Sequence, residues 1–312
     1  MKIVLLEELG VSNSIIEKYR EKLEKMGNQF ISYKKDLDIN TQIKRVKDAD
    51  ALIIANMPLD KKVLENAKKL KFIDVAFTGV DHIPLDVAKQ KNIAVSNASG
   101  YATQAVAELC ISFMIQLLRK IKENEVNCRE GKTKIVGNLL QGKTVGIIGA
   151  GKIGKRVAHL CKAFGCKVIV YNRSIVNDNS IDKQVELKEL LQESDIVSLH
   201  CPLTNKTEGM IGKKELSLMK KTAILINTAR GNIVKSEDLK EALETGVISG
   251  AACDVFEEEP PLSPDYNLIH TKNIILTPHM AFASIESLEE RAEIVFDNLF
   301  SWLDGKQKNK IL

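Results

Sequence analysis

One segment decides the fold: Thr144-Val145-Gly146-Ile147-Ile148-Gly149-Ala150-Gly151-Lys152-Ile153-Gly154. A short apolar strand runs into a G-x-G-x-x-G loop, and a helical pattern of apolar residues follows it. The first glycine of such a loop allows a tight turn, the second lets a pyrophosphate approach the backbone, and the third lets helix and strand pack closely. The start of the helix then offers N–H donors to phosphate oxygens. The segment therefore predicts a dinucleotide site, and the expected contact residues are Gly149, Gly151, Lys152, Ile153 and Gly154.

Outward from this loop, short apolar strands alternate with longer helical patterns. With the strand at 144–148, the C-terminal block has expected strands at 167–171, 196–199, 223–227, 250–254 and 274–277. Six parallel strands make a complete dinucleotide-binding sheet. The N-terminal block has expected strands at 3–6, 30–33, 51–54, 72–75 and 93–95. The alternation predicts an α/β protein with two doubly wound parallel-sheet domains, one of them a Rossmann-type domain.

The domain boundaries follow from the same pattern. A chain of 312 residues favours two domains. The helical pattern at 284–303 comes after the second block is complete, so we expect it to pack on the first. We therefore predict a flavodoxin-like domain of residues 1–100 plus 285–312, and a Rossmann domain of residues 101–284. A long helix at 103–122 leads into a polar stretch, 123–140, which we interpret as a connecting arm.

Composition excludes several classes of protein. Lys plus Arg total 45 against 41 Asp plus Glu, and this surplus of four is dispersed, which does not indicate nucleic-acid binding. No apolar run approaches the roughly 18 residues that span a bilayer, and the first apolar run is too short for a signal peptide. The six cysteines show no C-x-x-C pair, so we expect reduced thiols, a cytoplasmic protein and no metal site.

The residues after the strand expected at 167–171 bear on the choice of cofactor. A carboxylate is usual there, where it accepts the ribose hydroxyls of NAD. This chain has Asn172, Arg173 and Ser174 instead. A cation and a hydroxyl suit the 2′-phosphate of NADP, so the residues favour NADP. NAD is the alternative, if Arg173 is solvated or if Asp178 or Asp182 folds back.

Three polar segments follow expected strands in order: Asn227–Gly231, Asp254–Pro260 and Thr277–Ala281. Ligands of such sheets bind at the carboxyl ends of the strands, so a cation, a carboxylate and an imidazole could face one cleft.

With these motifs the chain resembles the D-isomer-specific 2-hydroxyacid dehydrogenase family over essentially its whole length. The glycine loop, the three segments and His200-Cys201-Pro202-Leu203-Thr204 occur in the family's order and spacing. The resemblance implies NAD(P)-dependent reduction of small 2-oxo acids of the glyoxylate or hydroxypyruvate kind. It implies that Arg230 binds substrate, that His279 is the acid/base, and that Glu259, directly before Pro260, is its partner. Histidine suits this proton transfer because its pKa lies near 6.5, and the arginine fork matches a carboxylate.

The resemblance also implies roles for residues outside the trio. In the first domain, the backbone N–H groups of Gly79 and Val80 would hold the substrate carboxylate. Tyr101 would reach the substrate, although packing between the domains is an equal interpretation. The remaining expected cofactor contacts are Thr103, Cys201, Pro202, Thr207, Thr228, Ala229 and Asp254, the last near the nicotinamide carboxamide.

The sequence leaves alternatives within and outside this class. A specific D-lactate or D-3-phosphoglycerate dehydrogenase would carry the same motifs. A nucleotide-sensing corepressor with the same fold could also retain the trio, and turnover with 2-oxo acids distinguishes it. Because the family usually dimerises through the connecting arm, here about 101–140, we expect a homodimer.

Overall fold

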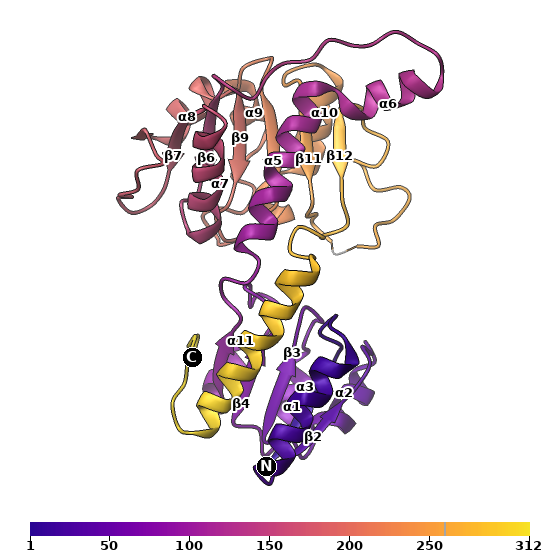
Figure 1. Cartoon of the computed structure of the whole chain (residues 1–312), viewed down its shortest axis with the longest axis vertical. Coiled ribbons are helices and arrows are strands. Elements are labelled where there is room, and N and C mark those ends of the chain that lie inside the picture. Colours follow the sequence, from indigo (N-terminus) through magenta and orange to yellow (C-terminus); the bar gives the residue numbers. More distant parts are fainter. Residues whose placement is uncertain (259) are drawn as a thin grey trace. The chain divides into compact units, whose positions relative to one another are not determined.

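The computed structural model describes residues 1–258 and 260–312 (Figure 1). The chain divides into two compact units. Unit 1 comprises Met1–Ala102 and Ala283–Leu312, and unit 2 comprises Thr103–Phe282. None of the helices in the described part of the chain is long and apolar enough to cross a membrane.

Unit 1 is built on a parallel sheet in the order β2-β1-β3-β4-β5. Its strands are β1 (Lys2–Leu5), β2 (Gln29–Ser32), β3 (Ala51–Ile54), β4 (Phe72–Val75) and β5 (Ala94–Asn97). Its helices are α1 (Asn13–Lys25), α2 (Ile39–Val46), α3 (Lys61–Asn66), α4 (Leu85–Gln90) and α11 (Ile285–Leu303). Every residue of β3 and β4 is buried, as expected for central strands covered on both faces.

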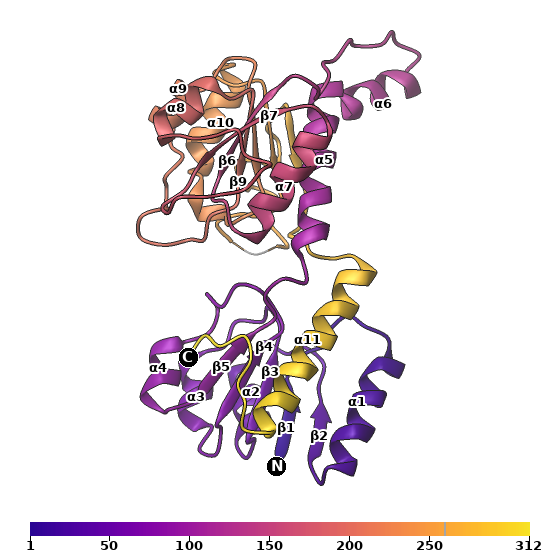
Figure 2. The same cartoon turned by 60° about the vertical axis from the view of Figure 1, so that its left-hand side comes forward.

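Helix α11 returns to unit 1 at the end of the chain. The Phe296 ring stacks on Tyr19 of α1 at 3.9 Å between centroids, and Trp302 stacks on Phe72 of β4 at 4.8 Å. The C-terminal tail then passes beside β5, where Lys310 pairs antiparallel with Ser96 (Figure 2). The aromatic stacking explains why a segment so late in the sequence belongs to the first unit.

Unit 2 contains a parallel sheet in the order β12-β11-β10-β9-β6-β7-β8. Its strands are β6 (Thr144–Ile148), β7 (Lys167–Tyr171), β8 (Lys183–Gln184), β9 (Ile196–Leu199), β10 (Ile224–Asn227), β11 (Gly250–Cys253) and β12 (Ile274–Leu276). Read from β8, this is the Rossmann order with one further strand, β12. The predicted fold class is confirmed, but the prediction of six strands missed β8, which is two exposed residues at the edge.

The helices of unit 2 are α5 (Thr103–Arg119), α6 (Ile121–Arg129), α7 (Lys152–Ala163), α8 (Leu187–Glu193), α9 (Lys213–Leu218) and α10 (Ser236–Glu244), with a short 3₁₀ turn at Gly231–Ile233. The helix over 103–122 and the connecting arm after it differ from what the sequence predicts. The predicted helix over 103–122 ends at Arg119, because Lys120 adopts a left-handed conformation, with φ of 51°. A second helix, α6, then forms largely within the stretch that we interpreted as a connecting arm, and all its residues are exposed or half-buried.

A buried carboxyl group lies in the core of unit 1. Asp74 of β4 is fully buried, and burial raises its pKa well above the ordinary value. The Nδ2 of Asn298 donates to Asp74 Oδ1 and to the carbonyl of Asn97, both at 3.1 Å. The bond from Asn298 ties α11 to two strands and lowers the pKa of Asp74 less than burial raises it.

We predict that Asp74→Asn reduces the pH dependence of stability. The folded wild type keeps the proton of Asp74 at pH values where the unfolded chain has lost it. Its free energy of unfolding therefore falls as pH rises above about 4, by at most about 1.4 kcal/mol per pH unit. The amide of the variant would still accept from Asn298 but cannot ionise. Urea unfolding of both proteins at pH 5 and pH 7 measures the difference, and identical pH dependence would contradict it.

Candidate active site

Each of the three glycines of the nucleotide loop meets a different constraint. Gly149 has φ of 95°, and a Cβ there would lie 2.6 Å from the backbone nitrogen of Cys201. A Cβ on Gly154 would collide with the carbonyl oxygen of Gly149. At Gly151, by contrast, no atom of the described residues lies within 4 Å of the Cβ position. Two glycines therefore serve packing, whereas Gly151 faces open space.

Gly151, the glycine that faces open space, lies directly before helix α7. Gly151 is the N-cap residue of α7, and Lys152 and Ile153 form its first turn. Gly151 has no side chain to offer the first N–H groups of α7, and these are the donors that phosphate oxygens take in dinucleotide sites. The described residues of the loop fit the pyrophosphate of a nicotinamide cofactor.

Asn172, at the end of β7, contacts the nucleotide loop. Its Oδ1 accepts from the backbone N–H of Ala150 at 3.1 Å, and its Nδ2 donates to the carbonyl and hydroxyl oxygens of Ser174. Arg173 and Ser174 are exposed. The amide therefore stabilises the loop, and one of its acceptor positions is already occupied.

The two carboxylates beyond Ser174 bind to α7. Asp178 pairs with His159 at 3.1 Å and with Lys155 at 3.7 Å, and Asp182 pairs with Lys162 at 2.8 Å. Hydrogen bonds from Ser180 lower the pKa of Asp178, and the bond from Lys162 lowers that of Asp182. Both carboxylates are thus ionised at neutral pH and bind to side chains of α7.

The turn that carries Arg230 is shaped by the buried amide of Asn227 at the end of β10. Its Oδ1 accepts from Ala229 N at 3.1 Å, and its Nδ2 donates to the carbonyl of Arg230 at 3.0 Å. The backbone of Gly231 lies against Phe256, where a Cβ would collide with the Phe256 carbonyl. The turn is therefore fixed against the loop that follows the neighbouring strand, and Arg230 is half-buried on it.

The carboxylate of Asp254 organises the segment that carries His279. It is fully buried after β11, and its Oδ1 accepts from Thr277 Oγ1 at 2.6 Å and Met280 N at 2.8 Å. Its Oδ2 accepts from Ala281 N at 2.8 Å, and the backbone N–H of His279 donates to the Asp254 carbonyl at 2.8 Å. Burial raises the pKa of Asp254, whereas these bonds and the charge of His279 lower it.

This network holds His279 in a left-handed conformation, with φ of 53°, which is uncommon outside glycine. The imidazole packs edge-on against Phe282, with ring centroids 5.8 Å apart. The sequence placed Asp254 beside the nicotinamide. In the structure, bonds within the chain occupy both of its carboxylate oxygens, a role that the sequence did not reveal.

The glutamates after Asp254 differ in their surroundings. Glu257 accepts from the hydroxyl of Ser236, at the start of α10, at 2.7 Å. Glu258 is exposed, and Glu259, the predicted partner of His279, lies outside the described residues. The side chain of Glu257 is therefore bound to the start of α10.

Polar contacts that the sequence did not predict surround the expected cofactor contacts near β9 and β10. His200 Nε2 bonds Ser198 Oγ at 2.8 Å, and burial lowers the pKa of His200 to about 4, so it is neutral. Thr228 Oγ1 lies 3.2 Å from the thiol of Cys110. The loop after His200 is held by Thr207, whose hydroxyl donates to the Pro202 carbonyl at 2.7 Å. Cys201 and Pro202 lie in this loop, Ala229 in the Arg230 turn, and Thr103 at the start of α5.

In unit 1, the loop that we predicted to hold the substrate carboxylate follows β4. Gly79 and Val80 are partly exposed, and Asn97 Nδ2 donates to the carbonyl of Thr78 at 2.7 Å. Tyr101 is only 2% exposed, and its ring meets Phe77 edge-on at 6.3 Å. Tyr101 is therefore packed within unit 1.

Comparison with known proteins agrees with this arrangement. The family model described as "D-isomer specific 2-hydroxyacid dehydrogenase, NAD binding domain" matches residues 111–281. The chain is 40% identical over 278 residues to the glyoxylate reductase of Thermococcus litoralis, covering 85% of this chain and 83% of that protein. It is 32% identical to the hydroxypyruvate reductase of Blautia hydrogenotrophica, covering 100% of this chain and 99% of that one.

Solved structures with bound cofactors are also similar. An acyclic imino acid reductase in complex with NADPH and D-Arg matches with a TM-score of 0.91 at 33% identity, and both chains are covered fully. The NAD-dependent formate dehydrogenase of Staphylococcus aureus, in complex with NAD, matches with a TM-score of 0.88 at 30% identity, over 100% of this chain and 99% of that one. The chain therefore belongs to the D-isomer specific 2-hydroxyacid dehydrogenase family and is an oxidoreductase that uses a nicotinamide cofactor.

Proposed function

We propose that the protein reduces small 2-oxo acids, of the glyoxylate or hydroxypyruvate kind, to D-2-hydroxy acids. The proposal rests on one observation, that Arg230, Asp254 and His279 follow three neighbouring strands. The Arg230 turn follows β10, and Asp254 follows β11. Asp254 in turn anchors the segment after β12 that carries His279. The names of the glyoxylate and hydroxypyruvate reductases among its relatives support this choice of substrates.

The proposed chemistry assigns one task to each group. The reduced nicotinamide supplies the hydride for C2 of the substrate. Arg230 binds the substrate through its planar two-point fork. His279 gives a proton to the carbonyl oxygen, and Glu259 orients the imidazole and favours its charged form. Gly79 and Val80 of unit 1 offer backbone N–H groups to the carboxylate.

We further propose that NADP is preferred over NAD. The position after β7 that usually carries a ribose-binding carboxylate holds Asn172 instead. Asp178 and Asp182, which could have replaced it, pair with Lys155 and Lys162 of α7. The exposed Arg173 and Ser174 offer a cation and a hydroxyl to a 2′-phosphate.

The proposed assembly is a homodimer that forms through the connecting arm, about residues 101–140. Large apolar side chains are exposed there, which is typical of an interaction surface. They are Ile121, Val126, Ile135, Val136 and Leu139, with Val136 84% exposed.

We predict that Arg230→Lys and His279→Gln both lower activity, for different reasons. Lysine keeps the charge but loses the fork, so kcat/KM for 2-oxo acids should fall about 10- to 100-fold. Loss of the proton donor should lower kcat by about 10²- to 10⁴-fold. Oxidation of the reduced cofactor with a panel of 2-oxo acids measures both, with Arg129→Lys on exposed α6 as the control. Wild-type kinetics in either variant would refute that residue's role.

The nucleotide loop gives a second prediction. Gly151→Ala should fold normally, because its Cβ enters open space, but it should raise the KM for the reduced cofactor at least about tenfold by obstructing the pyrophosphate. Gly154→Ala should destabilise the fold itself, because its Cβ collides with Gly149. Thermal unfolding and cofactor titration separate the two effects. Normal cofactor affinity in Gly151→Ala would show that the pyrophosphate binds elsewhere.

The cofactor preference is tested at Asn172 and Arg173. Wild-type kcat/KM should be higher with NADPH than with NADH by about 10- to 100-fold, the value of one charge-assisted bond. Asn172→Asp should reverse the preference, because a carboxylate accepts ribose hydroxyls and repels a phosphate. Arg173→Ala should raise the KM for NADPH alone. A wild-type preference for NADH would overturn the assignment.

A further inference from the structure

The chain that leaves β4 is bound by two consecutive residues at the end of β5. The backbone N–H of Ala98 donates to the carbonyls of Val75 and Phe77, at 2.9 and 3.1 Å. The side-chain Nδ2 of Asn97 donates to the carbonyl of Thr78 at 2.7 Å. Three carbonyl groups before residues 79 and 80 are therefore held toward β5, and the last of them is held by a side chain.

The bond from Asn97 sets the direction of one proposed substrate contact. Peptide units that do not precede proline are trans, so the C=O and the N–H of one unit point in opposite directions. The carbonyl of Thr78 and the N–H of Gly79 belong to the same unit. Because the amide of Asn97 binds this carbonyl, the N–H of Gly79 points away from Asn97. This N–H is one of the two donors proposed for the substrate carboxylate.

Both backbone polar groups of Asn97 are bound by the C-terminal part of the chain. The N–H of Asn97 donates to the carbonyl of Asn309 at 3.1 Å, and its own carbonyl accepts from Nδ2 of Asn298 at 3.1 Å. Asn298 belongs to α11, and Asn309 belongs to the tail that passes beside β5 (Figure 2). Asn97 is only 6% exposed, so water has little access to these bonds. The place of Asn97 therefore depends on residues from the end of the sequence.

The amide of Asn298 joins these parts into one network. Its Nδ2 donates to Asp74 Oδ1 as well as to the carbonyl of Asn97, and its Oδ1 accepts from Nδ2 of Asn309 at 2.8 Å. Asn298 is 1% exposed, and both the donor and the acceptor side of its amide are used. The network therefore links β4, the end of β5 and the tail through one buried side chain.

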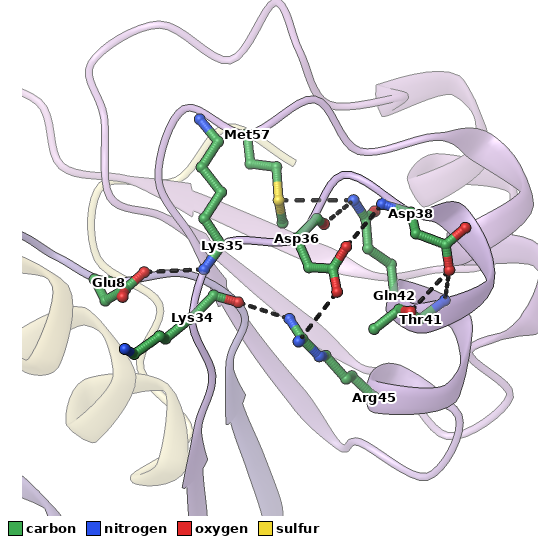
Figure 3. Close-up of polar contacts among 9 residues, drawn as sticks. All are labelled: Glu8, Lys34, Lys35, Asp36, Asp38, Thr41, Gln42, Arg45 and Met57. Carbon is green, nitrogen blue, oxygen red and sulfur yellow. Dashed lines mark hydrogen bonds and ion pairs between the residues drawn. The ribbon is translucent and has the colours of Figure 1, made fainter.

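The segment after β2, at the other side of the same sheet, is held by a nearby helix instead. Gln42 of α2 donates to the carbonyl of Asp36 at 2.9 Å, and Arg45 of α2 donates to the carbonyl of Lys34 at 2.7 Å (Figure 3). These contacts come from the next element in the sequence. The loop after β4 differs, because its anchor, Asn97, is itself held by α11 and the tail.

We propose that Asn97 is a positioning residue, which directs the N–H of Gly79 toward the carboxylate of the 2-oxo acid, and that Asn298 and Asn309 hold Asn97 in place. The inference rests on the proposed function, in which Gly79 and Val80 bind that carboxylate. Without the bond from Asn97, the peptide unit before Gly79 is free to rotate, and the substrate loses a hydrogen bond in the ground state and the transition state alike. Such a loss raises KM and leaves kcat nearly unchanged.

The test is steady-state kinetics with glyoxylate and with hydroxypyruvate at saturating reduced cofactor. Asn97→Ala should raise the KM for both acids by similar factors, about three- to tenfold, the value of one hydrogen bond. Both acids should respond alike because the carboxylate is common to them. Asn97→Asp should behave like Asn97→Ala, because a carboxylate has nearly the size of the amide but cannot donate to the Thr78 carbonyl. Asn309→Ala, at an exposed position, should raise the same KM at least about twofold.

The matched control is Asn66→Ala, because Nδ2 of Asn66 also donates to a backbone carbonyl, that of Lys62, at 2.8 Å within α3. Its kinetics should be those of the wild type. In all four variants kcat and the KM for the cofactor should stay within about twofold, and thermal unfolding shows whether each variant is folded.

Every other outcome is decisive. An unchanged KM for the acids in folded Asn97→Ala would overturn the proposal, as would an equal rise in the KM for the cofactor, which indicates a general loss of structure. If the Asn97 variants do not fold, an unchanged KM in Asn309→Ala overturns it. A wild type that reduces neither acid would contradict the proposed function and this inference with it. An active wild type with insensitive variants would contradict the inference alone.

Discussion

The buried carboxylate of Asp254 is the constraint on which the active-site geometry depends. It gathers Thr277, Met280 and Ala281 around one point, and its own carbonyl holds the backbone of His279. An isolated buried carboxylate would be costly, but one that accepts several hydrogen bonds is stabilised and rigid. The left-handed backbone of His279 is maintained by this surrounding network. The acid/base proposed for the reaction is thus positioned by the end of the neighbouring strand.

Close backbone contacts fix the other parts of the site in a similar way. Gly231 brings the Arg230 turn against Phe256, and Gly154 brings α7 against Gly149. Side chains at these glycines would separate the segments that form the edge of the sheet. Gly151 is different, because the space beside it is open for a ligand. The glycines of unit 2 therefore divide between those that assemble the site and one that admits the cofactor.

Much of the fold could be predicted from the sequence because buried parallel strands are continuous apolar runs. The strands from β1 to β7 and from β9 to β12 lie within two residues of their predicted bounds. Strand β8 has no apolar signal, and α6 lacks a buried face, so neither could be recognised by periodicity. Motif spacing could identify Asp254 and Asn172 as site residues. It could not show that their side chains bond to the His279 segment and to the nucleotide loop, because those contacts depend on the folded backbone.

We propose that the carboxyl edge of the unit 2 sheet supports hydride transfer to C2 of a 2-oxo acid. The most direct measurement uses a reduced cofactor that carries deuterium at C4 of the nicotinamide, with hydroxypyruvate as substrate and NMR analysis of the product. We predict glycerate with deuterium at C2 and the D configuration. Cofactor oxidation without deuterium at C2, or a product of the L configuration, would contradict it.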